Sequence, residues 1–314
     1  MLQQVAALLG QHFEALLLLY WSLASFASTV ALLPVPGAAG FRAAVRLSAC
    51  RGKLLEETPP RALGLLSNWT VPQRWFGHFY ALGSACNAAV AYLLLGSPFF
   101  ASLAPHQQAT AVLALALLQL HLGRRLAETQ GLMRYPPTAR MHGIAYLFGM
   151  SYYAIVSLSV LPPAAYLALF ERAAQLPAVL AAPPPALPRL NWVLSNVSAL
   201  QLAGAALFLA GNALQWHSHW LLARLGGKAK GRGPTYKIPR GGAFELVSCP
   251  HYLGEVAIYA GLVAALAGQR STAWLMLLWV VSNLSLAAGM THRWYRQHFK
   301  TYPARRRALF PLLF

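Results

Sequence analysis

A short polar segment interrupts the apolar C-terminal third of the chain. It spans residues 235–255 and reads TYKIPRGGAFELVSCPHYLGE. Gly241 and Gly242 permit a positive φ angle or a close approach of the backbone to another group. A glycine pair beside basic residues is one way to bind an anion such as phosphate. Most such pairs are plain turns, so the interpretation depends on the neighbouring residues.

The most informative residue of this segment is Glu255, which has only apolar residues after it for several turns. Burying a carboxylate at membrane depth costs on the order of several kcal/mol unless a hydrogen-bond donor or a cation pairs with it. His251 lies one helical turn before it. We expect the partner of Glu255 to be either an arginine in a structural salt bridge or a bound ligand.

A second polar group lies in the predicted helix 107–126. His121 and Arg125 are one turn apart and therefore share a face. Arginines in the inside loops of membrane proteins are more often topology signals than ligands, but the shared face sets Arg125 apart. Other ionisable residues at or near membrane depth are Arg124, His217, His219 and His292.

Several kinds of chemistry are missing from the sequence. There is no GxGxxG after a strand, no GxxxxGK[ST] and no His-rich metal motif. The chain contains no Asp, which argues against Ser/His/Asp catalysis, and its three cysteines have no CxxC spacing. What remains is a cofactor that supplies its own reactivity, held by basic and polar groups at the inside mouth of a bundle.

The elements that position these residues are predicted to be membrane helices. The chain is 57% hydrophobic and 10% charged, whereas soluble domains are about 25% charged. A membrane span needs about 20 apolar residues, and the sequence predicts an all-α polytopic membrane protein with seven transmembrane helices at 8–34, 76–97, 107–126, 141–162, 191–222, 251–268 and 272–291.

The distribution of basic residues predicts the topology. With the N-terminus luminal and the C-terminus cytosolic, only Arg172, Arg189 and Arg270 lie outside, and the other Lys and Arg residues lie inside. This asymmetry explains most of the net charge of +18 without nucleic acid. Residues 163–190 are expected to form an outside loop with one interfacial helix.

The C-terminal third resembles the steroid 5α-reductase family. The similarity is carried by YKIPRGGAFELVSCPHYLGE from Tyr236 and by THRWYRQHFKTYPARRRALFPLLF at the end of the chain. Three further motifs resemble its polyprenol (polyprenal) reductase branch: VPQRWFGHFY at 71–80, HLGRRLAE at 121–128 and HGIAYLFGMSYY at 142–153.

The resemblance implies one membrane reductase domain, 1–314, in the endoplasmic reticulum, with most of the NADPH site in about 191–314 and no metal. Members of the family transfer hydride to a carbon–carbon double bond conjugated to a carbonyl. The implied catalytic residues are Glu57, His292 and Tyr295. The implied cofactor-binding residues are Arg125, Tyr236, Gly241, Gly242, His251, Glu255, His292 and Tyr295.

The chain departs from the steroid enzymes at several positions. His251 replaces an Asn, Leu122 replaces a Tyr, and His219 replaces the Asp of an HSD stretch. An LRKPG-like stretch is replaced by LGGKAKGRGP, so its phosphate-contacting Arg has no assigned counterpart here, and Lys228, Lys230 and Arg232 are candidates. The lost Tyr argues against a steroid 3-ketone as substrate.

Hydride adds readily only to an electron-poor carbon, which favours a long-chain polyprenal over the corresponding alcohol. A donor from Glu57, Tyr295 or His292 would stabilise the enolate oxygen. The alternatives are steroid 5α-reductase activity, a lipid transporter without catalysis, and an isoprenylcysteine methyltransferase-like enzyme.

Overall fold

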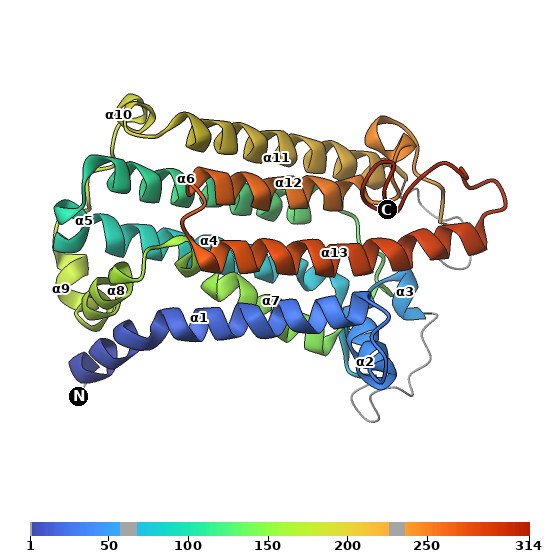
Figure 1. The fold of residues 1–314 in the computed structure, drawn as a ribbon, viewed down its shortest axis with the longest axis horizontal. Coiled ribbons are helices and arrows are strands. Elements are labelled where there is room, and N and C mark those ends of the chain that lie inside the picture. Colours follow the sequence, from blue (N-terminus) through green and yellow to red (C-terminus); the bar gives the residue numbers. More distant parts are fainter. Residues whose placement is uncertain (1, 57–67, 226–235) are drawn as a thin grey trace.

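The computed structural model describes residues 2–56, 68–225 and 236–314, and most of them are helical. The long helices lie side by side along one axis of the molecule (Figure 1). Each of the seven predicted spans overlaps one of them: α1 (Leu2–Leu32), α4 (Phe76–Leu95), α6 (Pro105–Ala127), α7 (Gly143–Ile155), α11 (Ala199–Leu225), α12 (Pro250–Ala265) and α13 (Ser271–His298).

Within the described residues, three helical segments are long and apolar enough to cross a membrane: Gln4–Leu32, Gln73–Leu95 and Ser271–His298. The chain is therefore a membrane protein. The helix α7 is apolar but shorter, with 13 residues. The helices α6 and α11 are long enough, but buried polar residues lower their hydropathy: His121, Arg125, Gln201, Asn212, Gln215 and His219. A full set of seven spans stays a prediction.

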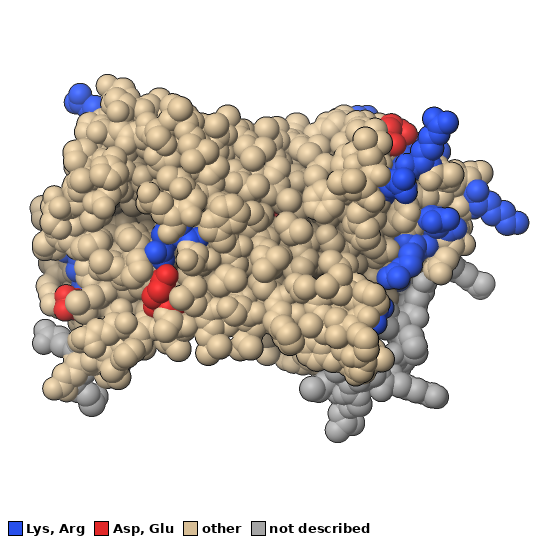
Figure 2. All heavy atoms as spheres, viewed as in Figure 1, with Lys and Arg blue, Asp and Glu red and all other residues tan. Residues whose placement is uncertain are grey.

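The two ends of the bundle differ. The N-terminus lies at one end, whereas α2 (Ala39–Ala49), α3 (Lys53–Glu56) and the C-terminus lie at the other (Figure 1). On the face shown in Figure 2, most of the Lys and Arg side chains gather at this second end. At the first end, Arg270 pairs with Glu14 at 2.9 Å. This separation of charge is the pattern that the sequence predicted.

A small sheet joins two loops at the basic end, which the all-α prediction did not include. The strand β1 (Thr70–Pro72) pairs antiparallel with β2 (Arg140–His142). Val71 and Met141 pair across the sheet and are both buried, so the pairing covers apolar surface. The first loop is tied to the same place, because Gly52 N donates to Arg140 O at 2.8 Å.

The predicted fifth span, 191–222, is not continuous. It divides into α10 (Leu190–Ser195) and α11, because Ser198 and Gln201 form a reciprocal cap. Ser198 N donates to Gln201 Oε1 at 2.9 Å, and Gln201 N donates to Ser198 Oγ at 3.3 Å. This S-x-x-Q pattern is a helix-start signal that the sequence contains.

The segment 163–190 holds two helices, α8 (Ala164–Ala174) and α9 (Leu176–Ala181), where one was expected. The helix α8 packs on α1, since a Cβ added to Gly10 would lie 2.6 Å from Leu167 Cα. The short helix α5 (Pro98–Ser102) lies at the same end of the bundle (Figure 1).

The closest helix pair is α11 with α12, which meet at four glycines: Gly204, Gly211, Gly254 and Gly261. A Cβ on Gly211 would lie 2.7 Å from Gly254 O, and one on Gly254 would lie 2.8 Å from Gly211 O. Small residues permit such backbone contact between membrane helices. The contact brings Gln215 of α11 against Glu255 of α12.

The first and last helices pack together and close the bundle. Ser28 Oγ lies 2.5 Å from Ser282 Oγ, and Ser25 Oγ donates to Leu275 O at 3.0 Å. Polar contacts of this kind hold helices together where the surroundings are apolar.

Candidate active site

A cavity of about 490 Å³ lies inside the bundle. One part of its lining is polar and comes from α6, α11 and α12: Arg125, Gln215, His219, His251 and Glu255. Another part is apolar and comes from α1, α7 and α13: Ala24, Ala27, Phe148, Trp279, Val280 and Leu284. The cavity can therefore receive a ligand that is polar in one region and hydrocarbon in another.

Glu255 meets protein donors in the cavity wall. Gln215 Nε2 donates a hydrogen bond to Glu255 Oε2, and His121 Nε2 lies 3.7 Å from Glu255 Oε1. Among the described residues, no arginine bonds directly to this carboxylate. Glu255 still lines the cavity.

The arginines of α6 pair with Glu128, which begins the π-helical turn Glu128–Leu132. Arg124 Nη1 and Arg125 Nη1 each donate to one oxygen of Glu128, and His219 Nδ1 lies 2.8 Å from Oε2. Burial raises the pKa of Glu128, but the hydrogen bond from His219 and the charge of Arg125 outweigh it and lower the pKa to about 2. Glu128 thus holds Arg125 at the cavity as a charged pair.

Arg125 also fixes a tyrosine at the cavity. Its Nε and Nη2 donate to the hydroxyl of Tyr80 at 3.2 and 2.8 Å, and its guanidinium lies 4.7 Å from the centre of the Tyr80 ring. Both residues line the cavity. The hydroxyl oxygen of Tyr80 thus already accepts hydrogen bonds from the positively charged guanidinium of Arg125.

Several tyrosines line the cavity, and one of them lies near Leu122. Leu122 and Tyr153 both flank Gly83 of α4, where an added Cβ would lie 3.0 Å from Leu122 and 2.9 Å from Tyr153. Tyr153 lines the cavity, as do Tyr152 and Tyr252. The phenols come from α4, α7 and α12, whereas α6 contributes a leucine.

His251 has an unsatisfied ring nitrogen. Its Nδ1 is buried and has no hydrogen-bond partner among the described residues. The ring itself packs against two others, with its centroid 4.2 Å from that of Tyr252 and 5.5 Å from that of His219. A buried polar atom without a partner is unusual and calls for a ligand or water. The described residues contain no group of three or more His, Cys or Glu that could hold a metal.

The glycine pair forms the bend that the sequence predicted. Gly241 and Gly242 have φ angles of +88° and +52°, which favour glycine. Gly241 N donates to the carboxylate of Glu245 at 2.7 Å, and a Cβ on Gly242 would lie 2.6 Å from the His217 ring. In this structure a carboxylate thus accepts the hydrogen bond from Gly241 that an anionic ligand would otherwise accept.

Tyr236 and Tyr295 belong to an aromatic cluster outside the cavity lining. Both pack with Trp294, and Lys53 Nζ of α3 lies 3.5 Å from the centre of the Tyr295 ring. Glu57, expected near the substrate, lies outside the described residues, as do Lys228, Lys230 and Arg232.

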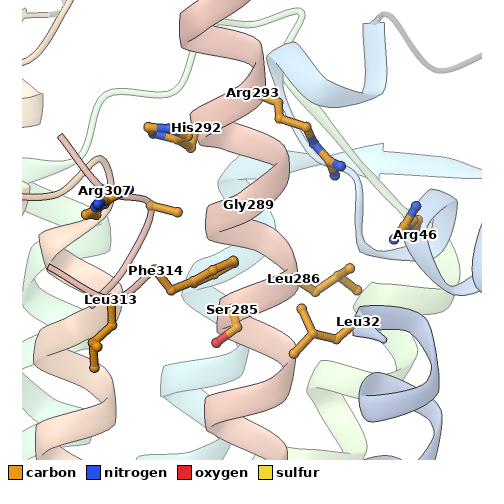
Figure 3. A pocket seen from close by; sticks show the side chains of 11 residues that line it. Leu32, Arg46, Ser285, Leu286, Gly289, His292, Arg293, Arg307, Leu313 and Phe314 are labelled. Carbon is orange, nitrogen blue, oxygen red and sulfur yellow. The ribbon is translucent and has the colours of Figure 1, made fainter. Parts of the chain in front are cut away.

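His292 faces a different pocket. Its Nδ1 lies 2.7 Å from Ser248 Oγ, and its ring lines a second cavity of about 320 Å³ on α13 (Figure 3). The structure therefore brings Arg125, His251 and Glu255 together at the main cavity, and it leaves His292 and Tyr295 outside that lining. The catalytic roles of the last two stay predictions.

Sequence reasoning missed other residues of the main cavity. Arg51 lines it and donates from Nη2 to the hydroxyl of Tyr252, and Tyr80 was part of a motif but was not expected to act. Glu128 was likewise within HLGRRLAE. The signal that could have identified Glu128 is an opposite charge one turn after an Arg pair, at i+3 and i+4.

Comparison with known proteins supports the family resemblance seen in the sequence motifs. Residues 191–314 match the 3-oxo-5-alpha-steroid 4-dehydrogenase family. Polyprenal reductase 1 of Oryza sativa subsp. indica is 32% identical over 96% of this chain and 97% of its own, and polyprenal reductase 1 of Arabidopsis thaliana is 33% identical over 93% and 94%. Polyprenal reductase of Caenorhabditis elegans is 31% identical over 79% and 81%.

The two plant relatives cover the chain almost from end to end, so the similarity extends well beyond the C-terminal third. It includes α4, α6 and α7, which supply Tyr80, Arg125 and Tyr153 to the cavity. The chain belongs to the steroid 5α-reductase family, in its polyprenal reductase branch, and is an oxidoreductase that acts on a carbon–carbon double bond.

Proposed function

We propose that the protein uses NADPH to reduce the α-isoprene double bond of a long-chain polyprenal, as a step of dolichol synthesis in the endoplasmic reticulum membrane. The relatives named polyprenal reductase support this substrate class. The observation that carries the proposal is the main cavity, whose polar lining from α6, α11 and α12 is combined with an apolar lining from α1, α7 and α13.

The residues at the polar wall fit a nicotinamide cofactor. The buried Nδ1 of His251 has no partner among the described residues and is suited to an amide or hydroxyl of the ligand. Arg125 supplies a charge that Glu128 holds in place, and Glu255 supplies an acceptor beside them. In this proposal Arg125, His251 and Glu255 hold the cofactor, with Tyr236, Gly241, Gly242, His292 and Tyr295 on its periphery. When bound, NADPH supplies a hydride for the β-carbon of the enal.

The chain itself must stabilise the charge that develops on the substrate. Reduction at the β-carbon of an α,β-unsaturated aldehyde produces an enolate, and preorganised donors aimed at its oxygen lower the barrier. Tyr80 and Tyr153 are donors at the cavity, and Glu57 is the further acid that the resemblance implies. The apolar wall accepts the isoprenoid tail and keeps water from the reacting carbon.

The same reasoning favours the aldehyde over the alcohol, because an allylic alcohol offers no acceptor for the incoming charge. A steroid 3-ketone offers one and stays the second candidate, since Tyr153 places a phenol beside the position of Leu122. A transporter would need a polar path across the whole bundle, and the observed cavity has an apolar wall.

The test uses purified full-length protein with NADPH and, in separate reactions, polyprenal, polyprenol or a 3-oxo-4-ene steroid, with NADPH loss and products measured. We expect turnover of polyprenal to dolichal. Reduction of polyprenol with no aldehyde present would overturn the mechanism. Faster turnover of the steroid would favour the second candidate, and binding of an S-adenosyl compound in place of NADPH would favour a methyltransferase.

A further inference from the structure

The second cavity lies at the basic end of the bundle, between α13, the end of α1, α2 and the C-terminal residues. Three arginines line it: Arg46 of α2, Arg293 of α13 and Arg307 of the C-terminal segment. In Figure 3 the side chains of Arg46 and Arg293 reach into the same space between α2 and α13. This cavity is separate from the polar wall described above.

Among the described residues, no carboxylate pairs with these arginines. None of the three side chains forms a salt bridge or hydrogen bond with another described residue, and the Nε atom of Arg46 is buried without a partner. Burial and the nearby charges of Arg42 and Arg293 lower the pKa of Arg46. Arg46 is half-buried, whereas Arg293 and Arg307 are exposed. The three side chains therefore gather positive charge at the mouth of the cavity, with no carboxylate paired to them among the described residues, and such a cluster favours an anion.

The rest of the cavity is apolar and follows α13 toward the bundle centre. Leu286 and Ser285 lie about two turns before Arg293, with Leu32 of α1 and Phe314 beside them (Figure 3). Because a helix rises 1.5 Å per residue, about 10 Å separates the level of Leu286 from that of Arg293. Gly289 lies between these levels, and an added Cβ there would meet only Phe314, at 3.4 Å.

We propose that this cavity binds an anionic glycerophospholipid of the surrounding bilayer. Its phosphate lies between Arg46 and Arg293, because guanidinium groups bind phosphate oxygens with paired hydrogen bonds. The first carbons of one acyl chain lie over Gly289 against Leu32 and Leu286. The cavity lies where the membrane helices α1 and α13 reach the predicted inside face, and anionic lipids attract basic residues there. A soluble phosphate would bind the arginines but would leave the apolar side chains of Leu32 and Leu286 uncovered.

The experiment measures binding of phosphatidic acid with a fluorescent acyl chain to the purified full-length protein in detergent micelles, without cofactor or substrate. Unlabelled phosphatidic acid, phosphatidylcholine, inorganic phosphate and NADP+ serve as competitors. We expect phosphatidic acid to compete at least 10-fold better than phosphatidylcholine, and the two soluble anions not to compete. Failure of the proposed reductase activity would leave this result unaffected.

Two kinds of variant locate the site. The double variant Arg46→Gln/Arg293→Gln should weaken binding at least 10-fold, and Gly289→Leu should do so by filling the cavity while keeping every charge. Arg305→Gln removes an exposed charge at the same end and should bind as the wild type does. Equal competition by phosphatidylcholine, displacement by inorganic phosphate or NADP+, or unchanged binding in a folded Gly289→Leu protein would each overturn the proposal.

Discussion

The hydroxyl of Tyr80 accepts hydrogen bonds from both Nε and Nη2 of Arg125, at 3.2 and 2.8 Å, at the wall of the main cavity. The guanidinium cannot accept the tyrosine proton, since it has no acceptor atoms. Arg125 therefore leaves the proton of Tyr80 available to another acceptor, and the adjacent positive charge strengthens that donor. Glu128 in turn fixes Arg125.

Replacement of Tyr80 tests whether this donor acts in the reaction. We expect Tyr80→Phe to lower kcat for polyprenal by about 100-fold, the usual effect of removing one donor to a developing oxyanion, with little change in NADPH affinity. Tyr92→Phe is the matched control on the same helix, since its hydroxyl bonds to Val179 O at 3.3 Å, away from the cavity. An unchanged kcat would exclude Tyr80 as the donor.

Replacement of Glu255 separates ligand binding from folding. Glu255→Gln keeps the size of the side chain but removes its charge, so we expect NADPH to bind about 10-fold more weakly, or about 1.4 kcal/mol, with unchanged folded yield. Glu14→Gln, which breaks the pair with Arg270 at the opposite end, should leave NADPH affinity unchanged. Collapse of folded yield in the Glu255 variant would mean that its role is structural.

Glu128 should be needed for stability. Glu128→Gln leaves Arg124 and Arg125 without the carboxylate that both contact, and loss of one partner of a buried ion pair costs about 3–5 kcal/mol. Thermal unfolding in detergent would measure this loss. A variant as stable as the wild type would show that the network is solvated and that Glu128 does not position Arg125.

The lowered pKa of Glu128 also predicts that the stability of the protein depends on pH. Its pKa is lowered from 4.5 to about 2 in the folded state, so its contribution is fully present above about pH 4.5 and is lost as the pH falls toward 2. We expect the unfolding temperature to fall across this window in the wild type and to fall less in Glu128→Gln. Equal slopes for the two proteins would contradict the assignment.

The glycines between α11 and α12 should be sensitive to a single methyl group. In Gly254→Ala the new Cβ would lie 2.8 Å from Gly211 O and 2.9 Å from Gln215 N, so we expect a loss of about 1–3 kcal/mol. Gly123→Ala on α6 is the control, because nothing lies within 4 Å of its Cβ and the helix gains up to about 1 kcal/mol. Similar effects at both positions would show that the helices can separate.

The positions of the long helices could be predicted because the hydrophobic runs are long and separated by basic or Pro-rich loops. The break before α11 was missed, although Ser198 and Gln201 carry the capping pattern, because the apolar run continues across it. The sheet between Thr70–Pro72 and Arg140–His142 was beyond prediction, since two three-residue strands in different loops have no period to detect.

At the site, the energetic cost of a polar side chain at membrane depth pointed to residues that line the cavity, but it did not indicate their partners. Glu255 and His251 both line the cavity, and the partner of Glu255 is Gln215, which carries no charge and therefore gave no signal. His292 shows the limit of reasoning from a motif, because residues of one motif need not line the same cavity. The His292 ring lines the second cavity and contacts Tyr302 of the aromatic cluster, to which Trp294 and Tyr295 belong.

The contact between α1 and α13 also determines when the molecule can be completed. Ser28 and Ser282 are 254 positions apart, and both Glu14 and Ser25 find partners in or beside the last helix. During synthesis, the first helix enters the bilayer long before its principal neighbour exists. A chain that terminates before residue 271 therefore loses more than the end of its sequence: its first helix keeps α8 as a neighbour but loses α13, and the wall that α1 and α13 share is never built.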